Sequence, residues 1–348
     1  MFMLNKLKNT IDKELIKFIA GLDKDYSLSK ISPLLFKSIK DFMLRPGKRV
    51  RPLLFAAGYL GYAKKPARRI YQSALSIELL HDFMLIHDDI IDKSCVRRGK
   101  PTVHVMLDQY LKSKKNLKFN GQDLAIVIGD IMYAMAIRAF LSIEEKMERK
   151  ERALRKFIDA AIYTGAGEFI ELICGIKTIE KTTKKDIFRI YDFKTAQYTF
   201  SSPLATGAIL AGADKKQVRL LSEYGIYIGR AFQIKDDIIG MFSQEKEIGK
   251  SVLSDLAESK KTLLVWYAYH KGDARSKRKI KNMLRSKNIT MRDLLKMRRL
   301  TVETKALEAA REEISRLSLK AGESLRKIAM KPQYKKILSE FAEKILAA

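Results

Sequence analysis

The chain has 348 residues, of which 47% are hydrophobic and 31% are charged, and its formal net charge is +28. A chain of this size can bury a large core. Its basic residues are spread, often at helical spacing beside Glu, so a solvated surface is favoured and we expect no nucleic-acid partner. Cys95 and Cys174 can build neither a disulfide framework nor a Cys-x-x-Cys zinc site.

The cellular location is predicted from the apolar segments. Residues 1–19 alternate apolar side chains with lysines, which predicts an amphipathic helix rather than a signal peptide. The most apolar run, residues 124–137, is too short to span a bilayer and contains Asp130. We therefore expect a cytoplasmic protein, whose positive charge is also compatible with peripheral contact with an anionic membrane.

Hydrophobic residues recur at helical spacing almost throughout, and no convincing strand is found. In the first part of the chain this pattern predicts helices at 4–20, from 29 or 32 to about 45, from 52 onward and at 67–92, then a polar turn at 93–102 and a basic loop at 112–122. Further helices are predicted at 123–147, 149–175, 183–213 and 215–242, followed by a charged loop at 243–261 and polar, basic helices from 262 onward. We expect one all-α domain over 1–348, with its motifs in a core at about 40–265 and a polar, basic helical region at about 266–348.

The helix predicted at 67–92 ends in an acidic sequence, Asp88-Asp89-Ile90-Ile91-Asp92. At about 3.6 residues per turn, Asp88 and Asp92 share a face, with His81 on the same stripe two turns earlier. Like charges one turn apart repel, and Mg²⁺ is a cation that would offset them, since it accepts one or two carboxylates together with substrate phosphates. Taken alone, this motif is more often a solvated helix end than a metal site.

A second acidic helix end, Phe232-Gln233-Ile234-Lys235-Asp236-Asp237, follows far downstream. Two such ends on separate helices are what a site for several Mg²⁺ ions would need. Basic residues accompany both motifs, and a Lys or Arg beside metal-binding carboxylates is typical of a diphosphate site. These basic residues are Lys48, Arg51, Arg97, Arg98, Lys194, Lys250 and Lys260. Lys194 alone could equally reach the surface from its apolar helix.

The motifs together resemble those of the trans-isoprenyl diphosphate synthases, the farnesyl/geranylgeranyl diphosphate synthase family, and most of all its archaeal-type geranylgeranyl members. The matching motifs lie between residues 47 and 262 and occur in the family's order. They are Gly47-Lys48-Arg49-Val50-Arg51-Pro52, His87-Asp88-Asp89-Ile90-Ile91-Asp92 followed by Arg97-Arg98-Gly99-Lys100-Pro101-Thr102-Val103-His104, Lys194-Thr195-Ala196, and Phe232-Gln233-Ile234-Lys235-Asp236-Asp237.

The resemblance implies a fold, a reaction and a set of partners. The fold is a bundle of long antiparallel helices around a deep central cavity, and the protein is a homodimer. The reaction is a Mg²⁺-dependent prenyl transfer that joins isopentenyl diphosphate to dimethylallyl, geranyl or farnesyl diphosphate and gives geranylgeranyl or farnesyl diphosphate. Three Mg²⁺ ions per active site are implied.

The resemblance also implies roles for single residues. Asp88, Asp92 and Asp236 bind Mg²⁺ with support from Asp89 and Asp237, and together with Lys194 they form the catalytic group. The residues for isopentenyl diphosphate are Lys48, Arg51, His81 and Arg98. Those for the allylic diphosphate are Arg97, Lys194, Lys250 and Lys260, while Thr195 and Gln233 line the reacting region.

Phe83 and Met84 lie five and four positions before Asp88, and the resemblance places them at the floor of the product pocket, where they would limit chain length. The chain departs from the family pattern at three places. Gly240 replaces a frequent third Asp, Glu168 follows Gly167 where Gln is common, and the loop at 249–262 lacks the usual Gly and Pro.

Two alternatives stay open. A terpene cyclase or head-to-head synthase would also ionise a diphosphate, but it would not need the group formed by Lys48, Arg51 and His81. A non-catalytic subunit would not be expected to keep the aspartates of both acidic motifs.

Overall fold

The computed structural model describes residues 2–243, 253–286 and 288–346. Apart from one short hairpin, the secondary structure of these residues is helical, so the predicted all-α class is confirmed. The chain groups into two compact units. Unit 1 comprises Met1–Leu154 and Thr206–Gly212, and unit 2 comprises Arg155–Ala205 and Ala213–Ala348. The single domain over 1–348 stays a prediction.

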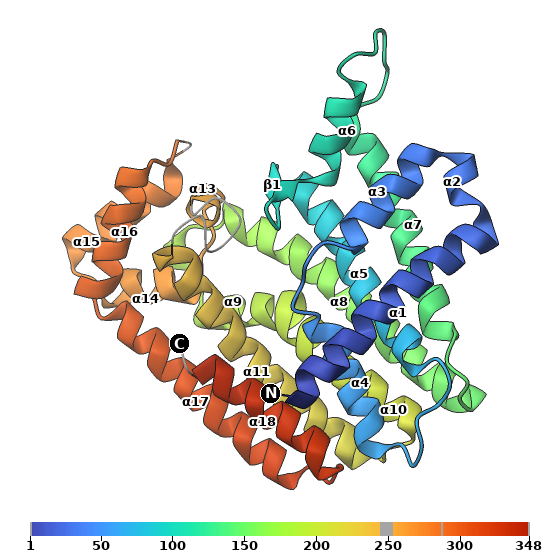
Figure 1. Cartoon of the computed structure of the whole chain (residues 1–348). Coiled ribbons are helices and arrows are strands. Elements are labelled where there is room, and N and C mark those ends of the chain that lie inside the picture. The colour runs from blue at the N-terminus through green and yellow to red at the C-terminus, as the bar shows by residue number, and fades with distance from the viewer. Residues whose placement is uncertain (1, 244–252, 287, 347–348) are drawn as a thin grey trace. The chain divides into compact units, whose positions relative to one another are not determined.

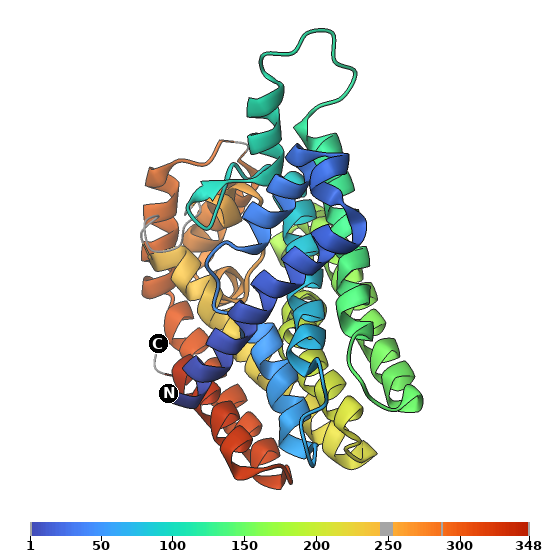
Figure 2. The ribbon, with the colours of Figure 1, turned by 45° about the vertical axis from the view of Figure 1, so that its right-hand side comes forward.

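Unit 1 is built on two long helices, α5 (Ile70–Ile91) and α7 (Gly121–Leu141), which lie side by side (Figure 2). Apolar side chains fill their contact with neighbouring helices, as in the edge-to-face packing of Phe140 on Phe55 with ring centroids 6.5 Å apart. The remaining elements of unit 1 are α1 (Phe2–Tyr26), α2 (Leu28–Ile31), α3 (Pro33–Met43), α4 (Val50–Tyr62), α6 (Val103–Leu111) and the hairpin of β1 (Val96–Arg97) and β2 (Lys100–Pro101).

Helix α7 is longer than the apolar run predicted within it. Its 21 residues are long and apolar enough to cross a membrane by length and composition alone, so the expectation that this segment is too short for a bilayer was wrong. The helix extends beyond the predicted apolar run by residues 121–123 at its start, where Asn120 forms a capping box, and by residues 138–141 at its end. We assign α7 to the core of unit 1, because Met132, Ala136 and Phe140 are fully buried in it.

Unit 2 is organised around α11 (Lys215–Phe242), whose observed bounds match the predicted helix. Asp214 caps its start by accepting a hydrogen bond from the backbone of Gln217 at 2.8 Å. Helix α11 packs on α17 (Ala306–Lys327) and on the π-helical segment η2 (Tyr191–Ser201) (Figure 1). The other elements of unit 2 are the 3₁₀ turn η1 (Ile179–Lys181), α9 (Lys184–Ile190), α13 (Ser254–Ala257), α14 (Leu263–Lys271), α15 (Ala274–Arg285), α16 (Met291–Glu303) and α18 (Pro332–Leu346).

Two helices continue from one unit into the other in sequence. They are α8 (Met147–Ile176) and α10 (Ser202–Ala211). The helix predicted at 183–213 is thus three segments, α9, η2 and α10, of which the middle one has the wider π-helical hydrogen-bond pattern. Such segments often occur at functional sites.

Candidate active site

The acidic end of α5 places its three aspartates in different surroundings. Asp88 is half-buried, and Asp92 is the half-buried C-cap residue whose backbone N–H donates to the carbonyl of Asp88 at 2.8 Å. Asp89 is fully buried, and its Oδ1 accepts two hydrogen bonds from the guanidinium group of Arg97, at 2.8 and 2.5 Å. Asp88 and Asp92 are therefore the residues of this motif best placed to bind a metal, while Asp89 anchors Arg97.

A row of buried acids on α5 was not predicted from the sequence. Glu78, Asp82 and Asp89 are 2%, 0% and 0% exposed, and they follow one another at helical spacing. Glu78 forms an ion pair with the buried Arg49 at 2.7 Å. The spacing of these acids within an otherwise apolar helix was the signal that could have revealed them.

Asp82 lies between the two paired acids and has no hydrogen-bond partner on either carboxylate oxygen among the described residues. The nearest cation is Arg98, whose Nη2 lies 4.0 Å from Oδ1 of Asp82. Burial, together with the negative charge of Glu78, raises the pKa of Asp82 well above its ordinary value.

The hairpin that follows α5 carries Arg97 and Arg98. Its strands pair Val96 with Pro101 and Arg97 with Lys100, which leaves a two-residue turn. Both turn residues, Arg98 and Gly99, have positive φ angles of 54° and 73°, as a tight hairpin turn requires. The hairpin was missed in the sequence because its strands have only two residues each.

Arg45 holds this hairpin in place from the end of α3. Its buried guanidinium group donates to the backbone carbonyls of Arg97 and Pro101, at 3.3 and 2.9 Å, and pairs with Asp41 at 3.0 Å. The predicted arginines of the site are therefore supported by an arginine that the motifs did not indicate.

Arg51 and Arg98 supply positive charge near the neutral His81 in unit 1. Burial, and then the positive charges of Arg51 and Arg98, hold the pKa of His81 well below its ordinary value. His81 is therefore neutral near pH 7 and can donate one ring N–H to an anion. Lys48 lies just before α4 with an exposed side chain, and Arg51 lies in the first turn of that helix.

Phe83 lies on α5 against two aromatic rings. Its ring centroid is 4.7 Å from that of His87 and 5.2 Å from that of Tyr133 on α7. Both Phe83 and Met84 are half-buried. These aromatic contacts hold the Phe83 ring between α5 and α7. A ring held in this way suits the predicted role of Phe83 in limiting the depth of a pocket.

In unit 2, the acidic end of α11 has one accessible and one buried aspartate, much as the end of α5 combines accessible aspartates with a buried one. Asp236 is exposed, whereas Asp237 is 7% exposed and accepts hydrogen bonds from Tyr191 and, at 3.0 Å, from Nε2 of Gln233. The side chain of Gln233 in turn accepts a hydrogen bond from Thr195 at 2.6 Å. The sequence motifs thus bring Thr195, Gln233 and Asp237 together, while Tyr191 was missed.

Lys194 projects from η2 toward two glutamates of α8. Its Nζ lies 2.5 Å from Oε2 of Glu168 and 2.5 Å from Oε2 of Glu171. The predicted substrate-binding lysine is therefore held by a carboxylate pair, one member of which is the departure from the family pattern at Glu168.

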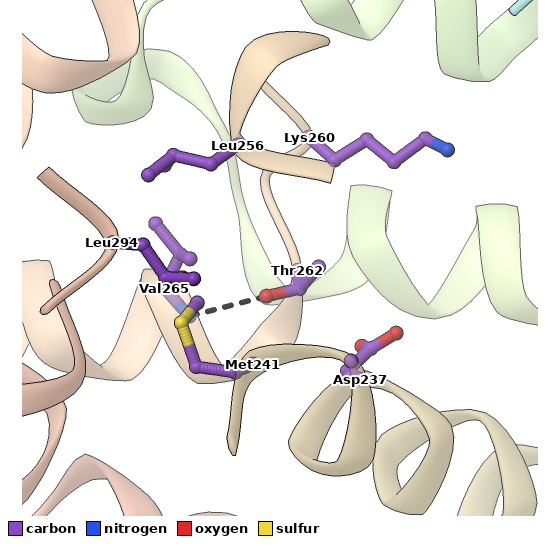
Figure 3. A pocket seen from close by; sticks show the side chains of 8 residues that line it. Asp237, Met241, Leu256, Lys260, Thr262, Val265 and Leu294 are labelled. Atoms are coloured by element: carbon purple, nitrogen blue, oxygen red, sulfur yellow. Dashed lines mark hydrogen bonds between the residues drawn. The ribbon is translucent and has the colours of Figure 1, made fainter. Parts of the chain in front are cut away.

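Lys260 lies near the acidic end of α11, beside a small pocket (Figure 3). Asp237 and Lys260 direct their charged ends to the same side of this pocket, and the opposite side is apolar (Figure 3). Gly240 is one of the lining residues, together with Met241, Leu256, Val265 and Leu294. Lys260 also pairs with Glu258 at 2.6 Å. Lys250 lies outside the described residues.

The donor set of both acidic motifs suits Mg²⁺. Asp88, Asp92 and Asp236 offer hard carboxylate oxygens and keep at least part of the side chain accessible. Within residues 2–243, 253–286 and 288–346, no group of three or more His, Cys, Asp or Glu residues forms a complete metal cage. Mg²⁺ does not need one, because it keeps several waters and uses one or two carboxylates with substrate phosphates.

Comparison with protein families identifies one match over most of the chain. The family described as Polyprenyl synthetase matches residues 32–300. A geranylgeranyl diphosphate synthase of Sulfolobus acidocaldarius is 34% identical over 254 residues, which are 72% of this chain and 72% of that protein. A geranylfarnesyl diphosphate synthase of Aeropyrum pernix is 37% identical over 66% of this chain and 68% of its own length.

Solved structures agree with these relatives. The crystal structure of a geranylgeranyl pyrophosphate synthase from Corynebacterium glutamicum, complexed with isoprenyl diphosphate and magnesium, has a TM-score of 0.88 and 25% identity, covering 99% of both chains. The corresponding synthetase from Pyrococcus horikoshii has a TM-score of 0.81 and 27% identity, covering 99% of this chain and 98% of its own.

Proposed function

The chain belongs to the polyprenyl synthetase family, and we propose that it is a Mg²⁺-dependent trans-prenyltransferase. It would condense isopentenyl diphosphate with an allylic diphosphate and release geranylgeranyl or farnesyl diphosphate. The observation that carries this proposal is the combination, in unit 1, of accessible acids at the end of α5 with the arginines of α4 and the hairpin. Asp88 and Asp92 lie at the end of the helix that also carries His81, whose pKa is lowered first by burial and then by the charges of Arg51 and Arg98.

The cationic group of unit 1 suits the diphosphate of isopentenyl diphosphate. Lys48, Arg51 and Arg98 supply positive charge, and Arg can bind phosphate oxygens with two parallel hydrogen bonds. The neutral imidazole of His81 adds a single N–H donor. An arriving anion would offset the charge of the arginines and so raise the pKa of His81 toward its ordinary value.

The allylic diphosphate is assigned to Arg97, Lys194, Lys250 and Lys260. Bound Mg²⁺, up to three ions held by Asp88, Asp92 and Asp236, would supply charge that stabilises the leaving diphosphate. The lysines and Arg97 assist as the allylic C–O bond breaks and its electron pair leaves with the diphosphate. The double bond of isopentenyl diphosphate then forms the new C–C bond, and the proton that is lost passes to the released diphosphate. Apolar side chains such as Phe83 keep water from the cation.

A second copy of the chain is the proposed partner protein. Helix α8 exposes a series of large apolar side chains within unit 2, an arrangement that usually marks an interface. They are Ile162, Phe169, Leu172, Ile173 and Ile176, with exposures of 62%, 66%, 49%, 45% and 80%. We propose a homodimer that covers this face and works in the cytoplasm, and expect Phe169→Glu to yield monomers in sedimentation analysis. A variant that remains dimeric would remove α8 from the interface.

The proposed reaction is tested with purified protein, Mg²⁺, labelled isopentenyl diphosphate and each allylic primer, with products separated by length. We expect elongation, and a fall of kcat/KM by about 10²–10³ in Asp88→Asn and in Asp236→Asn, the size of effect seen when transition-state charge stabilisation is lost. Asp25→Asn is the matched control, since Asp25 is a surface aspartate paired with Arg138. Failure of the wild-type protein to elongate any primer would refute the proposal.

A further inference from the structure

Tyr191 is a buried residue at the start of η2 whose hydroxyl group makes two hydrogen bonds. It donates to Oδ2 of Asp237 and accepts the backbone N–H of Leu263 at 2.8 Å. Burial, and then the carboxylate of Asp237, raise the pKa of Tyr191 well above its ordinary value. The hydroxyl group therefore keeps its proton and remains a donor across the physiological pH range.

The same hydroxyl group is one end of a chain of three hydrogen bonds that joins η2 to α11. Tyr191 and Thr195 lie four residues apart on η2, and Gln233 and Asp237 lie four residues apart on α11. Thr195 donates to Gln233 at 2.6 Å, Gln233 donates to Asp237 at 3.0 Å, and Tyr191 donates to the other oxygen of Asp237. Each oxygen of Asp237 thus has its own donor.

We infer that Tyr191 is a positioning residue for the second acidic motif. By holding the buried carboxylate of Asp237, it leaves Asp236 as the exposed acid of the pair. The inference rests on the proposed function, because it assigns Asp236 rather than Asp237 to the metal. Loss of the hydroxyl group removes the donor to Oδ2 of the buried Asp237, so we expect this carboxylate to be held less firmly and the neighbouring Asp236 to be placed less precisely.

Tyr191 also links this motif to the segment that carries Lys260. Leu263 is the first residue of α14, and Thr262, its N-cap, accepts a hydrogen bond from Val265 at 3.3 Å (Figure 3). Lys260 precedes this cap by two residues and lines the same pocket as Asp237. One hydroxyl group therefore fixes the acid of α11 relative to the backbone next to a proposed diphosphate-binding lysine.

The experiment compares Tyr191→Phe with Tyr224→Phe. Tyr224 is a matched control, because it is also a buried tyrosine of unit 2 and its hydroxyl group donates to the carbonyl of Leu338 at 2.6 Å. In Tyr191→Phe we expect the Mg²⁺ concentration for half-maximal rate to rise about tenfold, with less than a twofold change in KM for isopentenyl diphosphate. Tyr224→Phe should lose similar thermal stability and leave the Mg²⁺ dependence unchanged. Equal Mg²⁺ dependence in both variants would overturn the inference.

A second readout separates this inference from the proposed function. Hydrogen exchange at the Leu263 amide should become faster in Tyr191→Phe only, and Mg²⁺ with inorganic diphosphate should protect the segment 259–265 less than in the wild-type protein. If the wild-type protein elongates no primer, the proposed reaction fails, and these exchange rates alone decide the role of Tyr191. Unchanged exchange at Leu263, or equal protection in both proteins, would refute the role whatever the activity.

Discussion

Two buried aspartates of α5, seven residues apart, differ in how their charge is balanced. Asp89 accepts two hydrogen bonds from Arg97, whereas neither oxygen of Asp82 has a hydrogen-bond partner within the described residues. The sequence could place both on a helix that bears Mg²⁺ ligands, but not distinguish them. Which acid meets a guanidinium group depends on how the hairpin after α5 folds back.

Replacing Asp82 by Asn should stabilise the protein at pH 8. A raised pKa means that the folded state binds the proton more tightly than the unfolded state, so Asp82 lowers stability only as pH rises above about 4, its ordinary range. We expect a gain of about 1–3 kcal/mol at pH 8, because the wild-type protein must there either bury the charge of Asp82 or take up a proton on folding, and almost none at pH 4. Thermal unfolding at both pH values measures it.

Asp41→Asn is the control of opposite sign. Against the effect of burial, hydrogen bonds and charge from Lys100 and Arg45 lower the pKa of Asp41, so its replacement should destabilise the protein at pH 8. A constant difference between Asp82→Asn and the wild-type protein across pH 4–8 would show that the charge of Asp82 is not the cause.

Truncation of Phe83 should lengthen the product. Phe83 contacts His87 and Tyr133, and its removal would deepen the space below the acidic end of α5. We expect Phe83→Ala to make diphosphates at least one isoprene unit longer than those of the wild-type protein, as measured by chromatography of the labelled products. Phe140→Leu, a substitution in the α7 core against Phe55, should leave product length unchanged. An unchanged product in Phe83→Ala would show that Phe83 is not the pocket floor.

Among the helices, η2 shows that an apolar pattern can predict a helix without predicting its π-helical hydrogen bonding. The apolar spacing predicted a helix at 183–213, which is right in type. The π-helical form occurs where η2 packs on α11, and there Gly225 and Gly229 let the two backbones approach closely. A Cβ atom at Gly229 would lie 2.4 Å from Cα of Ala196, closer than any packed atoms. The start of α11, in contrast, was predicted correctly at residue 215, and Asp214 caps it in the structure.

Gly229→Ala should therefore strongly destabilise the protein. The added methyl group would overlap with Cα and Cβ of Ala196 and crowd the ring of Phe200, so we expect a loss of about 3 kcal/mol or more in chemical unfolding, at the upper end for overpacking. Gly322→Ala on α17 is the control, since nothing lies within 4 Å of its Cβ position and Ala should add about 0.5–1 kcal/mol. A neutral result at Gly229 would mean that η2 can move away from α11 at no cost.

At the scale of the whole molecule, fold class and motif order followed from the sequence, because helical periodicity is local and the motifs are contiguous. The contacts that support the site residues could not be predicted from the sequence. Arg45, Glu78 and Tyr191 act on residues far along the chain, and their partners are set by packing. The role of Lys250, which lies outside the described residues, stays a prediction, and so does the effect of the altered loop at 249–262.

The basic residues that give the net charge of +28 are spread along the whole chain rather than confined to one helix. We expect binding to vesicles that contain anionic lipid at 50 mM salt and release at 500 mM, because screening shortens the range of the attraction from above to well below 10 Å. Neutral vesicles are the control, and co-sedimentation measures the bound fraction. Binding that persists at 500 mM salt would point to an apolar contact instead.

The triad of Glu168, Lys194 and Glu171 has a consequence for the order of events. Two carboxylates share one ammonium group, so the triad carries a formal charge of −1 rather than +1. A bare diphosphate arriving at Lys194 would be repelled, whereas one that brings Mg²⁺ would be attracted. Rates measured at varied free and Mg²⁺-bound substrate should follow the bound form, and Glu168→Gln should weaken this preference severalfold. We therefore expect Glu168 to make the metal a condition for entry of the substrate.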